Sequence, residues 1–241
     1  MKAFEILFVA ITALTGCAKN SYQPLTTTSN NPMTTTVSGK DSLTYLALGD
    51  SYTVGEAEPQ LQSFPYQLKN LLISYGVNVT SPKVIATTGW TTDDLINGIS
   101  QGDIHGKTYD FVTLLIGVND QYQHLSQDNY RVKFAQVLAS AITFAKGDTS
   151  RVFVLSIPDW GVTPYGAGQD AVIGPQIDQF NAINKTISLQ AGVHYLDITG
   201  ISREASYDAT LIAPDGLHPS DKMYGLWVNL LEPMVKARLT R

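Results

Sequence analysis

The sequence predicts an α/β fold, a three-layer α/β/α sandwich in which helices cover both faces of a central, mainly parallel sheet of five strands. Short apolar runs alternate with helical patterns from Leu43 onward. The runs are apolar throughout, as expected of strands that are buried on both faces. Right-handed crossovers between such strands place helices on both sides of the sheet. The expected strands span residues 43–48, 84–86, 111–116, 151–157 and 193–196.

Helical patterns fill the connections between these runs. Ser63 is a candidate N-cap of the first helix, with Pro65 in its first turn and Gly76 at its end. Residues 91–94 open a second, short helix, and further helices are expected at about 128–145, 175–189 and 220–236. The Pro- and Gly-rich segment 158–174 is long for a simple connection, and long loops often carry function.

Residues 1–17 have the pattern of a signal peptide. Lys2 precedes the apolar run 6–14, which is too short to span a bilayer. Small residues then precede Cys17, the only cysteine, so that the segment resembles a bacterial lipoprotein signal. This resemblance implies that the protein is exported and that lipidated Cys17 anchors it to a membrane, facing the periplasm or the cell surface. The alternative is an ordinary secretory signal with a chance cysteine.

Residues 18–40 are predicted to be a flexible tether, and residues 41–241 to form one folded domain. The tether is rich in Thr, Ser and Asn and has almost no large apolar side chains. It therefore cannot bury enough surface to offset the entropy of ordering. The rest of the chain is long enough for one substantial core.

The composition argues against several partners. The 16 basic and 21 acidic residues are not clustered, and no basic stripe would neutralise phosphates, so we expect no nucleic acid partner. A single cysteine allows no disulfide within one chain. The His and acidic residues show no paired spacing on one helix face, so no metal site is expected.

Chemically useful residues follow the expected strands. Ser51 comes directly after the first strand, Gly89 follows the second, and Asn119 follows the third. Asp215 and His218 stand in a loop before the last helix. Ligands of parallel α/β folds bind beyond the carboxyl ends of the strands, so these residues are expected to meet in one cleft.

Acyl transfer requires a set of this kind. A serine hydroxyl needs an imidazole to take its proton, and the imidazole needs a carboxylate to fix its tautomer and stabilise its charged form. The oxygen charge of the tetrahedral intermediate needs fixed hydrogen-bond donors, which a side-chain amide or a backbone N–H group supplies.

Four short segments therefore carry the candidate residues: those at Ser51, at Gly89, at Asn119 and at Asp215 with His218. In this order, over about residues 46–220, they resemble the GDSL-type esterases and lipases, also called SGNH hydrolases. The resemblance implies a flavodoxin-like fold and a serine ester hydrolase that needs no cofactor. It implies that Ser51 is the nucleophile, His218 the general base and Asp215 its orienting carboxylate. The backbone N–H groups of Ser51 and Gly89 and the side chain of Asn119 would form the oxyanion hole.

The sequence departs from the family pattern at two places. Tyr52 stands where the name-giving motif has Leu, and we expect its ring to pack beside the turn without taking part in the chemistry. No Asn stands in the segment before Gly89, where many members carry one. The backbone donor does not need that Asn, so this departure concerns the geometry of the loop.

Other acidic residues near these segments have simpler interpretations. Asp50 and Asp120 are interpreted as carboxylates that hold turns by accepting hydrogen bonds from neighbouring N–H groups. Asp197, after the fifth strand, is a rival partner for His218. Asp215 is favoured because a single turn joins it to the histidine.

Histidine and aromatic side chains near the cleft leave alternatives open. His105 and His194 are interpreted as structural or surface residues, and so is His124, although it lies close enough to Asn119 to touch substrate. Three loop aromatics could line an acyl or sugar pocket or cover their own loops: Trp90, Trp160 and Tyr165. The loop after Gly55 hints at an apolar acyl site through Pro59, Leu61 and Phe64.

The substrate is expected to be a small-molecule, lipid or sugar ester. Short-chain acyl esters, lysophospholipids, thioesters and acetylated sugars all fit the family, so a carbohydrate O-acetyl esterase is an alternative to a carboxylesterase or lipase. A non-catalytic ligand-binding lipoprotein is the competing hypothesis from another class. Against it, every residue type that catalysis requires is present.

Overall fold

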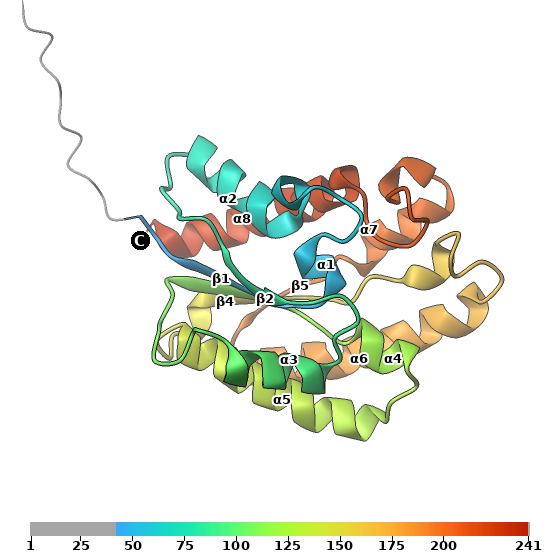
Figure 1. Cartoon of the computed structure of the whole chain (residues 1–241), viewed down its shortest axis with the longest axis horizontal. Coiled ribbons are helices and arrows are strands. Elements are labelled where there is room, and N and C mark those ends of the chain that lie inside the picture. The colour runs from blue at the N-terminus through green and yellow to red at the C-terminus, as the bar shows by residue number, and fades with distance from the viewer. Residues whose placement is uncertain (1–41, 241) are drawn as a thin grey trace, which may run out of the picture. The chain divides into compact units, whose positions relative to one another are not determined.

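The computed structural model describes residues 42–240, which form a five-stranded parallel sheet with helices on both faces (Figure 1). The strand order is β2-β1-β3-β4-β5, and every neighbouring pair is parallel. The predicted three-layer α/β/α sandwich is confirmed. All five strands overlap the apolar runs that predicted them: β1 (Tyr45–Gly49), β2 (Lys83–Ala86), β3 (Phe111–Leu115), β4 (Val152–Leu155) and β5 (His194–Leu196).

Long helices form the two outer layers (Figure 1). On one face, α2 (Phe64–Ser74) packs beside α8 (Asp221–Leu239). On the other face lie α3 (Thr92–Gln101), α5 (Gln127–Phe144) and α6 (Asp170–Ala191). Three short helices that the sequence did not predict follow the carboxyl ends of β1, β3 and β5: α1 (Ser51–Val54), α4 (Val118–Tyr122) and α7 (Thr199–Arg203).

The core lies between the sheet and the inner faces of these helices. Every residue of β1, β3 and β4 is buried. Tyr45 of β1 stacks on Phe111 of β3 with ring centroids 4.3 Å apart, and its hydroxyl hydrogen-bonds Thr113 at 2.8 Å. On the α2 side, Phe64 is fully buried and packs 6.4 Å from Trp227 of α8, centroid to centroid. Burying one side chain of this size stabilises the fold by roughly 1.5–3 kcal/mol.

Side-chain caps begin two of the helices where the sequence predicted a start. Thr91 and Asp94 form a capping box at α3, in which each side chain accepts a hydrogen bond from the other residue's backbone N–H. Ser220 caps α8 through its hydroxyl. Ser63 precedes α2 as predicted, but its hydroxyl donates to the Gln60 carbonyl at 2.9 Å and does not cap the helix.

Helix α6 begins at Asp170 and not at Pro175, where the sequence predicted its start. Proline lacks an N–H group and favours the first turn of a helix, which explains the misplaced prediction. The turn before Pro175 is helical: the Gln169 carbonyl accepts hydrogen bonds from the N–H groups of Val172 and Ile173, and the Ile173 side chain is buried. The connection between β4 and α6 is therefore shorter than predicted and covers residues 156–169.

The predictions for the N-terminal part fall on residues that the structure does not describe. These are the signal peptide 1–17, lipidation at Cys17 and the tether 18–40. Within residues 42–240, none of the helices combines the length and the hydrophobicity that crossing a membrane requires.

Candidate active site

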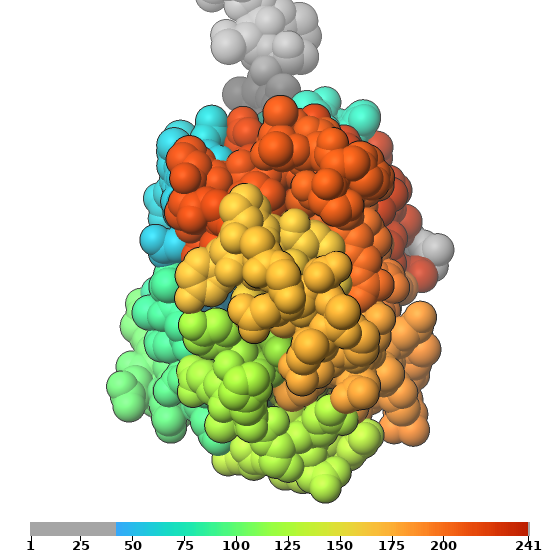
Figure 2. Space-filling view, turned by 90° about the vertical axis from the view of Figure 1, so that its right-hand side faces the viewer, coloured from blue at the N-terminus to red at the C-terminus, as the bar shows by residue number. Residues whose placement is uncertain are grey.

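The residues that follow the strands surround a cavity of about 180 Å³ at the carboxyl edge of the sheet. Four of the predicted site residues line it: Ser51 after β1, Gly89 after β2, Asn119 in α4, and His218 before α8. The fifth, Asp215, does not line the cavity but hydrogen-bonds the His218 ring. Figure 2 faces this edge, where the amber segment after β4 lies between the orange-red segment that precedes α8 and the yellow-green segment around α4.

Ser51 is the first residue of α1, at the sharp turn that ends β1. Asp50 caps this helix, because its Oδ1 accepts a hydrogen bond from the Tyr52 N–H at 3.1 Å. Only glycine fits at Gly49, since a Cβ there would collide with the Leu115 carbonyl on β3. Ser51 is 4% exposed and lines the cavity, so a reactant reaches its hydroxyl through this cavity.

His218 and Asp215 form a hydrogen-bonded pair, with 2.6 Å between His218 Nδ1 and Asp215 Oδ2. Asp215 Oδ1 also accepts from the backbone N–H groups of Leu217 and His218, each at 3.0 Å. Burial raises the pKa of Asp215, but these hydrogen bonds outweigh it and hold the pKa below its ordinary value. The carboxylate is therefore ionised at neutral pH and leaves Nε2 as the ring nitrogen that can take a proton.

Tyr52 lines the cavity and packs against the His218 ring. The two rings meet edge to face with centroids 5.8 Å apart, and Tyr52 also packs against Trp227. Its ring thus lies beside the turn, as the sequence analysis expected. Within residues 42–240 no hydrogen bond joins the Ser51 hydroxyl to His218. Catalytic hydrogen bonds are often long before substrate binds and shorten in the reacting complex.

Gly89 and Asn119 line the same cavity as Ser51, and each carries a hydrogen-bond donor. Gly89 has a φ of 86°, which a residue with a side chain adopts only under strain, and no acceptor among the described residues binds its N–H. Asn119 Nδ2 donates to the Trp90 carbonyl at 2.9 Å, which orients the amide and leaves its second hydrogen available. Next to Gly89, the Thr88 hydroxyl donates to the Glu56 carboxylate and ties this turn to the segment after α1. No local sequence pattern predicts this contact.

Asp50 and Asp120 are buried carboxyl groups beneath the site. Burial raises the pKa of Asp50 to about 8; the hydrogen bond from Tyr52 opposes this shift and the nearby Asp120 adds to it. Burial also raises the pKa of Asp120 to about 6, against the hydrogen bonds that it accepts from Thr92 N and Oγ1, both at 2.9 Å. Both groups hold turns, but Asp120 reaches across 28 positions to join α4 to α3 instead of bonding a neighbour.

Three aromatic side chains form one side of the cavity, and we call them the aromatic wall: Tyr122, Trp160 and Tyr165. The two tyrosine hydroxyls hydrogen-bond each other at 2.9 Å. The Trp160 ring lies 5.4 Å from Tyr122 and 6.0 Å from Tyr165, centroid to centroid. Trp160 and Tyr165 were among the predicted candidates. Tyr122 was missed, although it stands three residues after Asn119 in a helix and therefore on the same side.

The remaining pocket candidates lie elsewhere. Trp90 does not line the cavity, and its ring packs over Gly98 of α3. The expected apolar acyl site is wrong, because none of its three residues lines the cavity. Phe64 is part of the core and Leu61 is 66% exposed. The apolar character of Phe64 reflects packing between α2 and α8.

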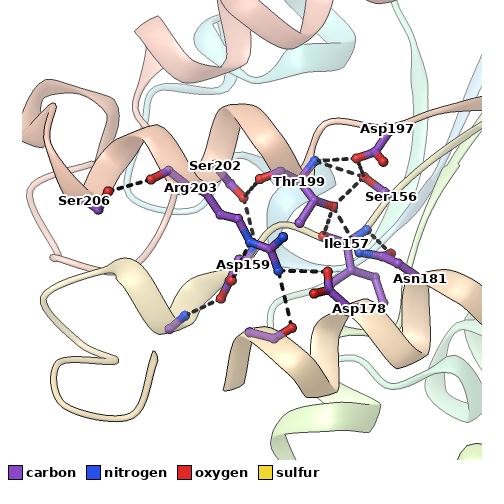
Figure 3. A network of polar contacts seen from close by, with 12 residues as sticks. Ser156, Ile157, Asp159, Asp178, Asn181, Asp197, Thr199, Ser202, Arg203 and Ser206 are labelled. Atoms are coloured by element: carbon purple, nitrogen blue, oxygen red, sulfur yellow. Dashed lines mark hydrogen bonds and ion pairs between the residues drawn. The ribbon is translucent and has the colours of Figure 1, made fainter. Parts of the chain in front are cut away.

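A polar network fixes the segment that carries Trp160 (Figure 3). Asp159 is 4% exposed and accepts hydrogen bonds from Arg203 Nε of α7 and from the Gly161 N–H, both at 2.9 Å. Arg203 Nη2 also bonds Asp178 of α6 at 2.8 Å. One arginine therefore links the start of the aromatic wall to two helices.

Asp197, the rival carboxylate, belongs to this network and not to the His218–Asp215 pair (Figure 3). Its Oδ1 accepts from the Thr199 N–H at 3.1 Å and from the Ser156 hydroxyl at 3.3 Å. The structure thus favours Asp215 as the partner of His218.

The other histidines and possible metal ligands do not contribute to this cavity. His105 and His194 do not line it. Within residues 42–240 there is no group of three or more His, Cys, Asp and Glu side chains arranged to hold a metal ion.

Comparisons with known proteins agree with this architecture. A family model described as the GDSL-like Lipase/Acylhydrolase family matches residues 47–226. A lipase/acylhydrolase structure from Enterococcus faecalis has a TM-score of 0.65 at 17% identity, covering 81% of this chain and 96% of that chain. An acetylxylan esterase from Geobacillus stearothermophilus has a TM-score of 0.59 at 19% identity, covering 83% and 94%.

A psychrotrophic esterase from Pseudoalteromonas sp. has a TM-score of 0.59 at 16% identity, covering 83% of this chain and 100% of that chain. No curated protein sequence gives a significant match. At these identities the solved structures show a shared fold.

Proposed function

The chain belongs to the GDSL-like Lipase/Acylhydrolase family of ester hydrolases, and we propose that Ser51, His218 and Asp215 are its catalytic triad. The observation that carries this proposal is the 2.6 Å hydrogen bond between His218 and Asp215 beside a cavity that Ser51 also lines. Because Asp215 occupies Nδ1, the base that faces the serine is Nε2.

In the first half of the reaction, the Ser51 oxygen attacks the ester carbonyl carbon while His218 Nε2 takes the hydroxyl proton. The carbonyl π electrons move to the oxygen and form the tetrahedral oxyanion. This intermediate collapses, the bond to the alkoxy oxygen breaks, and His218 gives its proton to the leaving alcohol. The acyl group then remains on Ser51 as an ester.

In the second half, a water molecule attacks the acyl-enzyme and His218 takes one of its protons. Collapse of the second tetrahedral intermediate releases the carboxylic acid, and the proton returns to the Ser51 oxygen. We assign the oxyanion to the N–H groups of Ser51 and Gly89 and to Asn119 Nδ2. Each such donor contributes about 2.7–4 kcal/mol to the stabilisation of the transition state.

The cavity volume supports a short acyl group. At about 180 Å³ it is comparable to cavities of roughly 150 Å³ that hold one benzene molecule in another protein. A long fatty acyl chain needs more space than this. We therefore propose acetyl to butyryl esters as the preferred class, ahead of long-chain lipids.

The test is hydrolysis of p-nitrophenyl esters from acetate to palmitate by the wild type, Ser51→Ala and His218→Ala. We expect activity on the short esters that both variants lose by at least about 10³-fold. His105→Ala, which changes an exposed histidine away from the cavity, is the matched control and is expected to keep full activity. A fluorophosphonate probe should label the wild type but not Ser51→Ala. A folded wild type with neither labelling nor hydrolysis would overturn the proposal.

We also propose that the protein is exported and anchored to a membrane by a lipid on Cys17. This proposal rests on the N-terminal sequence alone, namely a short apolar run that ends in small residues before the single cysteine.

A further inference from the structure

A second, larger groove of about 540 Å³ adjoins the catalytic cavity at the aromatic wall. Tyr122, Trp160 and Tyr165 line both hollows, so the groove lies directly beside the cavity, with the three rings between them. The volume lies within the range of small-molecule sites, about 300–1,000 Å³. If the cavity holds the acyl group, the groove is the adjoining space for the alcohol part of the ester.

We propose that this groove binds the alcohol part of the substrate and that this alcohol is a neutral carbohydrate. The inference rests on the proposed function, because it assigns the second half of the same ester. Three properties of the groove support it: exposed aromatic rings, side-chain amides with free hydrogen-bonding groups, and an absence of charge among its lining residues.

The rings of the aromatic wall offer the kind of surface that a sugar ring covers. Tyr122 is 46% exposed and Tyr165 is 53% exposed, so large apolar faces border the groove. Each tyrosine combines such a face with a polar hydroxyl at its tip. A sugar ring has the same mixed character, with C–H groups on its faces and hydroxyls at its edge.

An amide relay holds one donor in position beside these rings. Gln121 Oε1 accepts from Trp160 Nε1 at 2.8 Å, and Gln121 Nε2 donates to Gln176 Oε1 at 2.7 Å. The Gln176 amide is thereby oriented, and its Nε2 has no acceptor among residues 42–240. Gln169, which also lines the groove, adds a second exposed amide. Amides donate and accept hydrogen bonds, as sugar hydroxyls do.

The charge of the groove disfavours other ligands. No Lys, Arg, Asp or Glu is among its lining residues, and His124 is the one histidine there. A phosphate headgroup or an acidic sugar would lack a positive partner on burial. An acyl chain would displace water from the amides of Gln176 and Gln169 and would offer them no hydrogen bonds in return. A neutral polyhydroxy compound avoids both costs.

Binding can be tested without hydrolysis. We would titrate the full chain with unacylated xylotetraose, maltotetraose and chitotetraose in a calorimeter, up to about 10 mM because such sites are often weak. We expect saturable binding of at least one oligosaccharide, and a loss of about tenfold in affinity in Gln176→Leu. Gln179→Leu is the matched control, since Gln179 also lies on α6 and pairs with another glutamine, Gln127, outside the groove.

A kinetic test separates this inference from the proposed function. The ratio of kcat/KM for acetylated xylotetraose to that for p-nitrophenyl acetate should fall about tenfold in Gln176→Leu and in Gln169→Leu, and stay constant in Gln179→Leu. Hydrolysis of p-nitrophenyl acetate without binding of any oligosaccharide would overturn the inference and leave the proposed function intact. Oligosaccharide binding without hydrolysis of any ester would overturn the proposed function and leave the carbohydrate site intact. Unchanged affinity and ratio in both glutamine variants of folded protein would also overturn the inference.

Discussion

Asp215 uses both oxygens to orient His218, and this predicts how its amide replacement behaves. In Asp215→Asn, the amide oxygen can still accept from the backbone N–H groups of Leu217 and His218. The NH₂ group would face His218 Nδ1 and favour the tautomer whose Nε2 carries the proton and cannot act as a base. We expect kcat for p-nitrophenyl acetate to fall about 10⁴-fold with little change in melting temperature. Asp197→Asn, which changes the rival carboxylate, should lower kcat by less than about twofold. A large loss in the Asp197 variant instead would contradict the assignment.

Asp50 makes stability depend on pH. Its pKa is about 8 in the folded protein against an ordinary value of 3.8, so the folded state holds this proton more tightly than the unfolded chain does. Between these pH values unfolding releases the proton, and the free energy of unfolding falls as pH rises. One proton gives a slope of at most about 1.4 kcal/mol per pH unit. Asp120, with a pKa of about 6, adds to the slope only at lower pH.

Asp50→Asn should remove this slope between about pH 6 and 8, because the amide is neutral and keeps an oxygen for the Tyr52 N–H. The measurement is urea unfolding of both proteins across this range. Asp128→Asn, which replaces an exposed carboxylate on α5, should keep the wild-type slope. If Asp50→Asn also kept it, another group would have to carry the pH dependence.

Among the elements, those with a local sequence signal were predictable. Continuous apolar runs followed by polar turns located all five strands and therefore the residues after them, such as Ser51 and Asn119. Features that depend on packing between distant segments were not predictable. Phe64 has the same apolar side chain whether it lines a pocket or, as here, packs against α8. The contact of Asp120 with Thr92 likewise requires two connections to meet at the sheet edge.

The link between α7 and the aromatic wall predicts a coupled effect on stability and substrate binding. Arg203→Met leaves the Asp159 carboxylate, which is 4% exposed, without its cation. We expect a loss of about 1–3 kcal/mol in the free energy of unfolding, less than for a fully buried pair because Arg203 is 39% exposed. Since Trp160 follows Asp159, KM for p-nitrophenyl acetate should rise as well.

Urea unfolding and steady-state kinetics measure these two effects. Lys133→Met is the control, because it removes an ion pair of 2.6 Å between Lys133 and Asp93, whose carboxylate is 45% exposed and stays hydrated without its cation. It should cost less than about 1 kcal/mol and leave KM unchanged. If both variants lost the same free energy of unfolding, the Arg203–Asp159 pair would contribute no more than the Lys133–Asp93 pair, which would contradict this prediction.

At the scale of the whole molecule, the site is assembled from four connections that are far apart in the sequence, yet all of them lie between residues 51 and 218. Residues 42–240 supply the five-stranded sheet, the core that covers it and the residues that line the cavity. Catalysis and membrane attachment should therefore be separable. We expect a variant that lacks residues 2–40 to hydrolyse p-nitrophenyl acetate with the wild-type kcat/KM.

Attachment, in contrast, should depend on Cys17 alone. A lipid anchor gains about 0.8 kcal/mol for each CH₂ group that it buries in a bilayer, so removing the acylated residue should release the protein while leaving the site unchanged. In bacteria that process lipoproteins, we expect the full chain to take up labelled palmitate and to enter the detergent phase on phase separation. Cys17→Ser and the variant without residues 2–40 should do neither, with equal activity in all three proteins. A full chain that stays in the aqueous phase would contradict lipidation, whereas unequal activities would show that the N-terminal residues take part in catalysis.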